Sequence, residues 1–187
     1  KMARESSLDV SGHFLVVGNP LPTLPDFSTL PFAEKEAVGV EGILNEAGLL
    51  VRDFFKADGN PRATKANVMK CLSGAKWAHF ACHGDIDTDS LVLALPADTI
   101  EGTKEMTNLS MTEVQGVELA RGSTIVLSAC NTGRGEINGE GVVGLSRGFL
   151  LAGAASTVVS LWSVDDGSTA ALMQSMYCHL VDGFSVA

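Results

Sequence analysis

The stretch AHFACHGDID, residues 78–87, runs from small and apolar residues directly into Cys82, His83 and Gly84, and then into acidic residues. An apolar run of this kind predicts a buried strand over 77–82. Because successive side chains of a strand alternate between its two faces, Cys82 and His83 point in opposite directions. We expect Cys82 to be a small buried hydrophobic residue and His83, where Gly84 lets the backbone turn, to take part in chemistry.

Similar apolar runs recur along the chain and are separated by stretches with helical spacing. Several of these runs lack a polar alternation, which is typical of strands covered by helices on both faces. The pattern predicts one α/β domain with a mostly parallel central sheet and helices on both faces. The predicted strands are 13–18, 48–55, 76–82, 123–130 and 155–161, and the predicted helices are 32–47, 63–74, 111–116, 141–153 and 168–183.

The segments between these elements are rich in turn-forming residues. We expect loops at 20–31, which holds four of the six prolines, at 96–108, and at 131–141. Thr64 and Ser110 are suitable helix N-caps, and Ser110 with Glu113 fits the capping-box pattern. Loops that follow the strands of an open parallel sheet are where such folds place their sites.

Cys130 ends the strand at 123–130 and is followed by glycines at 133 and 135. It lies 47 residues after His83, and in caspases the histidine lies about 50 residues before the cysteine. A nearby imidazole favours the thiolate, which attacks a carbonyl, and then protonates the leaving amine. Cys130 and His83 are therefore the candidate dyad, with the backbone N–H groups of Gly84 and Cys130 as the candidate oxyanion hole. The sequence shows no obvious third acid, and a backbone carbonyl could orient the imidazole equally well.

The motifs HFACHG and LSACNTG, together with LVVGNP and GEGVVGLSRGFLLAGAASTVVSLWSVDD, resemble the CHAT family of caspase-like, clan CD cysteine peptidases. The resemblance covers nearly the whole chain and is closest to the eukaryotic versions linked to tetratricopeptide repeats (TPR). It implies a caspase-hemoglobinase fold, a His83–Cys130 dyad and cleavage of protein or peptide substrates through an acyl-enzyme. We expect residues 1–187 to be one domain, cut from a longer protein with an upstream regulatory TPR domain and truncated at its C-terminus.

The resemblance also implies a substrate pocket, which we assign to Ser128, Trp162 and Asp165, with Asp166 as an alternative to Asp165. In related clan CD enzymes such as separase, the segment after the fifth strand lines the pocket for the residue before the cut. An acid there would favour arginine or lysine. The alternative is that Asp165 and Asp166 cap the helix that begins near Ser168.

Composition narrows the class of protein. The net charge of −9 and the pI near 4.8 argue against a nucleic-acid binder. No apolar stretch is long enough to span a bilayer, and no signal peptide is evident, so we expect an intracellular, cytoplasmic protein without membrane contact. The four cysteines form no disulfide framework and no CxxC pair, and we expect neither a metal nor a cofactor.

Two alternatives belong to other classes. GEGVVG at 139–144 has the spacing of a dinucleotide-binding motif, but about ten residues separate Cys130 from Gly139, so the first glycine does not end the strand. The glycines more readily explain close packing of a helix against the sheet and mobility of the loop over Cys130. The other alternative is a catalytically silent, caspase-like interaction or regulatory module of a TPR protein.

Overall fold

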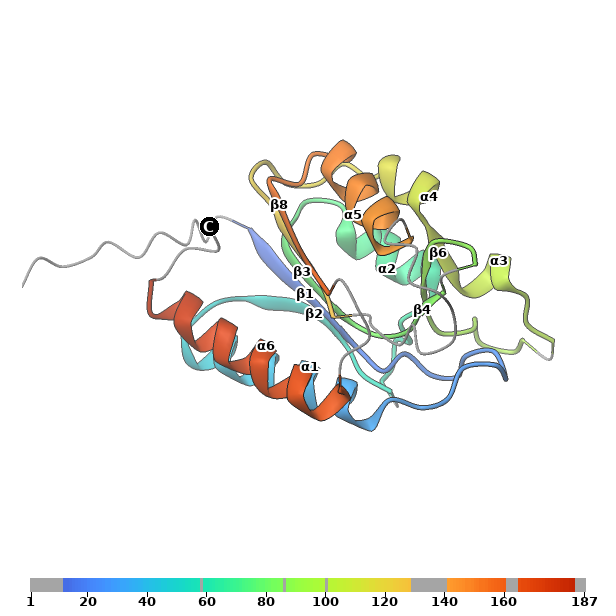
Figure 1. Cartoon of the computed structure of the whole chain (residues 1–187), viewed down its shortest axis with the longest axis horizontal. Helices are drawn as coiled ribbons and strands as arrows, with labels where there is room; N and C mark the ends of the chain where they lie inside the picture. The colour runs from blue at the N-terminus through green and yellow to red at the C-terminus, as the bar shows by residue number, and fades with distance from the viewer. Residues whose placement is uncertain are drawn as a thin grey trace, which may run out of the picture.

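The computed structural model describes residues 12–57, 59–85, 87–99, 101–128, 141–160 and 165–183. A central sheet of five parallel strands, in the order β2–β1–β3–β7–β8, crosses the middle of the molecule (Figure 1). This arrangement confirms the predicted α/β architecture. The strands are β1 (His13–Gly18), β2 (Val51–Phe55), β3 (Ala75–Ala81), β7 (Thr124–Leu127) and β8 (Ser156–Val159).

Helices cover both faces of this sheet, as the apolar strands require. Figure 1 shows α1 and α6 on one face, with α2, α4 and α5 on the other. Each face has its own apolar cluster, one containing Trp77 and Tyr177 and the other containing Phe80 and Phe149. The helices are α1 (Pro31–Glu46), α2 (Lys65–Leu72), α4 (Met111–Gln115), α5 (Gly141–Leu151) and α6 (Asp166–Val181).

Strand β3 is buried along its whole length, and its side chains alternate as the sequence predicted. Trp77 and His79 face α1 and α6, where both rings contact Tyr177. Phe80 and Cys82 belong to the opposite cluster, and Cys82 is 1% exposed. The prediction that Cys82 packs as a buried hydrophobic residue is confirmed.

A second, smaller sheet lies beside the first and was not predicted. It consists of three short antiparallel strands, β4–β5–β6. The prediction of a loop over 96–108 is wrong at its C-terminal end, where a one-turn helix leads into a strand. These strands have two or three residues each, which is too few for a periodic pattern to appear in the sequence. The elements are β4 (Gly84–Asp85), β5 (Ser90–Val92), α3 (Lys104–Thr107) and β6 (Asn108–Ser110).

The predicted helix caps are confirmed. The Thr64 side chain accepts a hydrogen bond from the backbone N–H of Asn67 at the start of α2. Ser110 and Glu113 form the reciprocal capping box at the start of α4. Pro31, at the end of the predicted loop, is the first residue of α1. This position suits proline, which lacks a backbone N–H, because an N–H in the first turn of a helix has no helical partner.

Candidate functional site

His83 lies in the short connection between the two sheets, two residues after the end of β3 and directly before β4. Its carbonyl accepts a hydrogen bond from the backbone N–H of Val92 (2.9 Å), and the carbonyl of Ala81 accepts one from Asn19 (2.9 Å). The side chain is 7% exposed. The backbone on both sides of His83 is therefore fixed by neighbouring strands and loops.

The imidazole of His83 is oriented by a backbone carbonyl. Its Nε2 atom lies 2.7 Å from the oxygen of Ser28, and the ring packs against Phe27 with 5.3 Å between ring centroids. A carbonyl oxygen only accepts hydrogen bonds, so Nε2 carries the proton and donates it. In the neutral ring, Nδ1 is then the nitrogen with a lone pair.

The loop that supplies Ser28 is held at its ends. Asn19 adopts a left-handed backbone conformation (φ 47°) directly after β1, and its side chain accepts a hydrogen bond from the N–H of Leu30 (2.8 Å). The Pro22 carbonyl accepts one from Leu95 (2.7 Å). Sequence reasoning missed Ser28, because the partner of His83 is its backbone carbonyl, a group that every residue carries. It also missed Phe27, whose ring packs against His83 from the same loop. The one usable signal was Asn19, a residue type that tolerates positive φ.

Strands β3 and β7 are adjacent and parallel, with four successive pairs from Trp77–Thr124 to Phe80–Leu127. Their carboxyl ends therefore meet at one rim of the sheet. Ser128 follows β7 directly and is 8% exposed, and its hydroxyl has no hydrogen-bond partner among the described residues. Cys130 and Trp162 lie outside the described residues.

Gly84 belongs to β4 and pairs with Leu91 in the small antiparallel sheet. In such a ladder, hydrogen-bonded and non-hydrogen-bonded pairs alternate. Because the adjacent pair, His83 and Val92, is joined by a hydrogen bond, the N–H of Gly84 points away from β5. Gly84 therefore directs its donor outward from the small sheet.

A polar network supports the segment that follows Gly84. Asp85 is 7% exposed and accepts hydrogen bonds from Lys104 Nζ and Asn108 Nδ2, each at 2.8 Å. Burial acts to raise the pKa of Asp85, but hydrogen bonds from Lys104, Thr88 and Asn108 outweigh it, and the pKa lies below its usual range. Asp85 is thus an ionised structural residue, a role that sequence reasoning did not assign.

Asp165 is the N-cap of α6. Its carboxylate accepts hydrogen bonds from both the backbone N–H and the hydroxyl of Ser168 (2.9 Å each). These two bonds hold the pKa of Asp165 below its usual range. The capping interpretation is confirmed for Asp165, and the residue is exposed at the first turn of the helix.

The described cysteines, Cys71, Cys82 and Cys178, form no disulfide. Burial, followed by a hydrogen bond to Asp53 and the charge of that residue, raises the pKa of Cys71 to about 11. Cys178 is exposed. Within the described ranges, no three histidine, cysteine or acidic side chains are grouped as a metal site requires, and no helix there is long and apolar enough to cross a membrane.

Comparison with known proteins identifies the family of the chain. A family model described as the CHAT domain matches residues 2–187. Tetratricopeptide repeat protein 28 from Mus musculus and from Homo sapiens are each 26% identical to the chain over 208 residues. Each alignment covers 92% of this chain but only 8% of the relative's length.

Proposed function

Because the chain belongs to the CHAT domain family, whose members are related to the clan CD cysteine peptidases, we propose that it is a cysteine endopeptidase. His83 and Cys130 form the catalytic dyad, and the substrates are proteins or peptides. Because its relatives are named for tetratricopeptide repeats, a TPR domain is the proposed regulatory partner.

The register of β3 and β7 carries this proposal. Every residue of β3 that pairs with β7 does so with a residue 47 positions later in the chain. His83 and Cys130 are also 47 positions apart, each three residues beyond the last pair, Phe80 and Leu127. Parallel strands in register deliver equivalent positions to the same rim, which supports a histidine and a cysteine that meet there.

The protonation of His83 fits a general base. With Nε2 donating to Ser28, Nδ1 takes the proton from the thiol of Cys130, and the thiolate attacks the scissile carbonyl carbon. The imidazolium then protonates the leaving amine, and an acyl-enzyme remains on the sulfur. A water that gives its proton to Nδ1 attacks the acyl carbon, and the returning proton frees the thiol of Cys130 with the carboxylic acid product.

The developing oxyanion needs donors that point to it. The N–H of Gly84 points away from the small sheet, which supports its role in an oxyanion hole together with the N–H of Cys130. One such donor contributes about 3 kcal/mol to stabilisation of the transition state in comparable sites.

Ser128, Trp162 and Asp165 form the proposed substrate pocket. The buried Ser128 hydroxyl, at the rim after β7, supports this assignment because it has no partner among the described residues. A carboxylate retains lone pairs after two hydrogen bonds, so Asp165 can cap α6 and still favour an arginine or lysine before the cut.

The alternative function is a catalytically silent interaction module of a TPR protein. It is favoured by the relatives, whose names record repeats and no peptidase activity. Thiol reactivity distinguishes the two functions. In a Cys178→Ser background, which removes the exposed thiol, Cys130 should react with iodoacetamide at pH 7 at least about tenfold faster than Cys71 or Cys82.

His83→Ala should abolish that difference. Equal rates for all three thiols would favour the silent module. Activity itself is tested by the cleavage sites formed in a denatured proteome, with Cys130→Ala as the inactive control. New peptide ends that depend on both Cys130 and His83 are expected, and identical profiles for the wild type and Cys130→Ala would reject the endopeptidase.

A further inference from the structure

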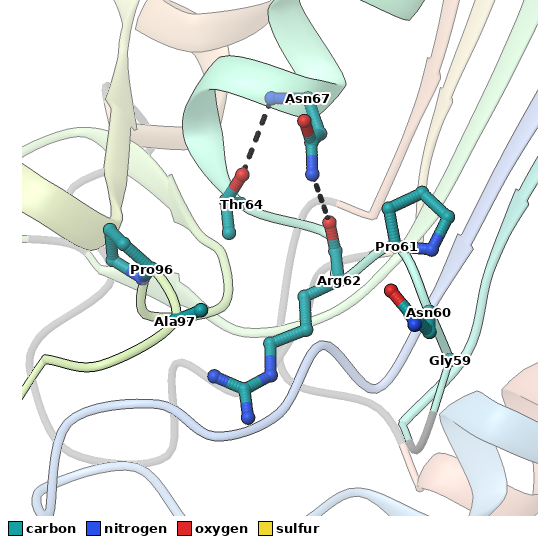
Figure 2. Close-up of a pocket in the computed structure, with 8 residues that line it drawn as sticks. All are labelled: Gly59, Asn60, Pro61, Arg62, Thr64, Asn67, Pro96 and Ala97. Carbon is teal, nitrogen blue, oxygen red and sulfur yellow. Dashed lines mark hydrogen bonds between the residues drawn. The ribbon is translucent and has the colours of Figure 1, made fainter.

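A pocket of about 570 Å³ opens between the loop that follows β2 and the segment that follows β5 (Figure 2). Asn60 and Pro61 form one wall, Pro96 and Ala97 form the other, and Arg62 extends between them. Among the described residues that line this pocket, Arg62 alone carries a charge. A single positive group among the lining residues of a pocket suits an anionic ligand.

The backbone of Arg62 is fixed, while its guanidinium has no ion-pair partner among the described residues. The Arg62 carbonyl accepts hydrogen bonds from the N–H of Thr64 (2.8 Å) and from Asn67 Nδ2 (2.9 Å). In the described part of the chain, no carboxylate pairs with the guanidinium. The amides of Asn60 and Asn67 line the same pocket and supply further donors.

The pocket lies on the same rim of the sheet as His83. Strands β2, β1 and β3 are neighbours and parallel, so the loops that follow β2 and β3 leave the same edge. The loop at 20–31 contacts both His83 and the surroundings of the pocket. The Ser28 carbonyl accepts a hydrogen bond from His83, and the Pro22 carbonyl accepts one from the N–H of Leu95, which precedes the pocket residue Pro96. The ends of β2 and β3 are two strand spacings, about 10 Å, apart, and the pocket residues of the loop after β2 begin four positions beyond its end.

We propose that this pocket binds the aspartate or glutamate side chain of a peptide that lies extended along the rim. An extended chain advances about 3.3 Å per residue, so the acidic residue is about three to five positions from the bond held at His83. The guanidinium of Arg62 donates two parallel N–H···O hydrogen bonds to the carboxylate. The inference rests on the proposed function only for the position of the scissile peptide bond at His83.

The test measures binding without cleavage. The probes are fluorescent peptides with one fixed arginine, and each has a glutamate three, four or five positions before or after it. Each glutamate peptide has a partner with glutamine at the same position. Both are titrated into the 187-residue Cys130→Ala protein. The best glutamate peptide should bind about five- to tenfold more tightly than its glutamine partner, and added salt should reduce the difference. Arg62→Gln should remove the difference, whereas Arg62→Lys should retain part of it because it keeps the charge.

Arg121→Gln is the matched control, since it removes the same charge before β7, at the opposite end of the sheet. It should leave the glutamate preference unchanged. Equal binding of both peptides, no binding of either, or a preference that survives Arg62→Gln would overturn the inference. A preference that depends on Arg62, found in a protein whose wild type cleaves nothing, would uphold the pocket and reject the endopeptidase.

Discussion

At the scale of single residues, His83 depends on a contact that any backbone can supply. In a serine-protease triad, an aspartate selects the tautomer of the histidine, and here the Ser28 carbonyl has that role. The carbonyl is itself held through the bond of Asn19 to Leu30. The orientation of the imidazole is therefore set by a loop conformation rather than by a third side chain.

Asp165 combines a structural and a proposed functional role that mutation can separate. Asp165→Ala should lower the melting temperature, because Ser168 loses the acceptor that caps α6. Asp165→Asn keeps a capping oxygen and should preserve the melting temperature, yet should weaken cleavage after arginine and lysine because the charge is lost. Scanning calorimetry and a cleavage-site profile measure the two effects.

Each result has its own contradicting outcome. An unchanged melting temperature in Asp165→Ala would reject the capping role. An unchanged preference for basic residues in Asp165→Asn would reject the role in the pocket.

At the scale of secondary-structure elements, the start of α5 is packed against the turn between β4 and β5. Asp89, which has a left-handed backbone (φ 48°), lies against Gly144, and a methyl group at Gly144 would overlap the Asp89 carboxylate. Burial raises the pKa of Asp89, although a hydrogen bond with the backbone of Leu145 partly offsets it. The expected close packing of this helix is against the sheet, whereas the close contact at Gly144 is with the turn between β4 and β5.

This contact predicts a substitution whose effect changes sign with its background. In the wild type, Gly144→Ala should destabilise the protein by about 1–3 kcal/mol, because the Asp89 carboxylate must move. In an Asp89→Gly background, the same change should stabilise it by up to about 1 kcal/mol, the usual gain of alanine over glycine in a helix. Glycine is chosen at 89 because it suits the positive φ.

Urea denaturation of the four proteins in this cycle gives both values. Effects of the same sign in both backgrounds would show that Asp89 does not determine the requirement for Gly144.

At the scale of the whole molecule, the sheet separates two apolar clusters, and one of them contains a buried ionisable pair. Glu36 Oε1 of α1 lies 2.9 Å from His79 Nε2 of β3, with both side chains at most 2% exposed. This is an ion-pair distance, although within the described ranges the two groups are not aligned for a hydrogen bond and neither atom has another partner. Tyr177 of α6 packs against the imidazole, and burial, with the charge of Glu36, raises the pKa of its phenol.

Removal of one partner should cost far more than removal of both. Glu36→Ala should destabilise the protein by about 3–5 kcal/mol, because His79 is left buried without its partner. The double variant Glu36→Leu/His79→Leu should lose less than Glu36→Ala alone, since two apolar side chains suit the cluster. Urea denaturation measures both losses.

Glu46→Gln is the control on the same helix, where an exposed glutamate should change stability by less than about 0.5 kcal/mol. A double variant that is less stable than Glu36→Ala would show that the pair is a net source of stability.

Local sequence determined the elements that are long enough to show a period. The bounds of β1 are those predicted, 13–18, and the caps at Thr64 and Ser110 follow from their side chains. Strand β2 begins at Val51 rather than at residue 48, because Gly48 takes a positive φ (74°) in the turn that ends α1. Hydrophobic periodicity does not mark such a turn.

The candidate dyad also came from local sequence, since His83 and Cys130 each follow an apolar run. Only the tertiary structure decided what surrounds His83, which is the Ser28 carbonyl and the small sheet that directs the Gly84 N–H, and where the Arg62 pocket opens on the same rim. The physical reason is that periodicity and capping are interactions between residues close in the chain. A hydrogen bond to a carbonyl 55 residues away depends instead on how the loops pack.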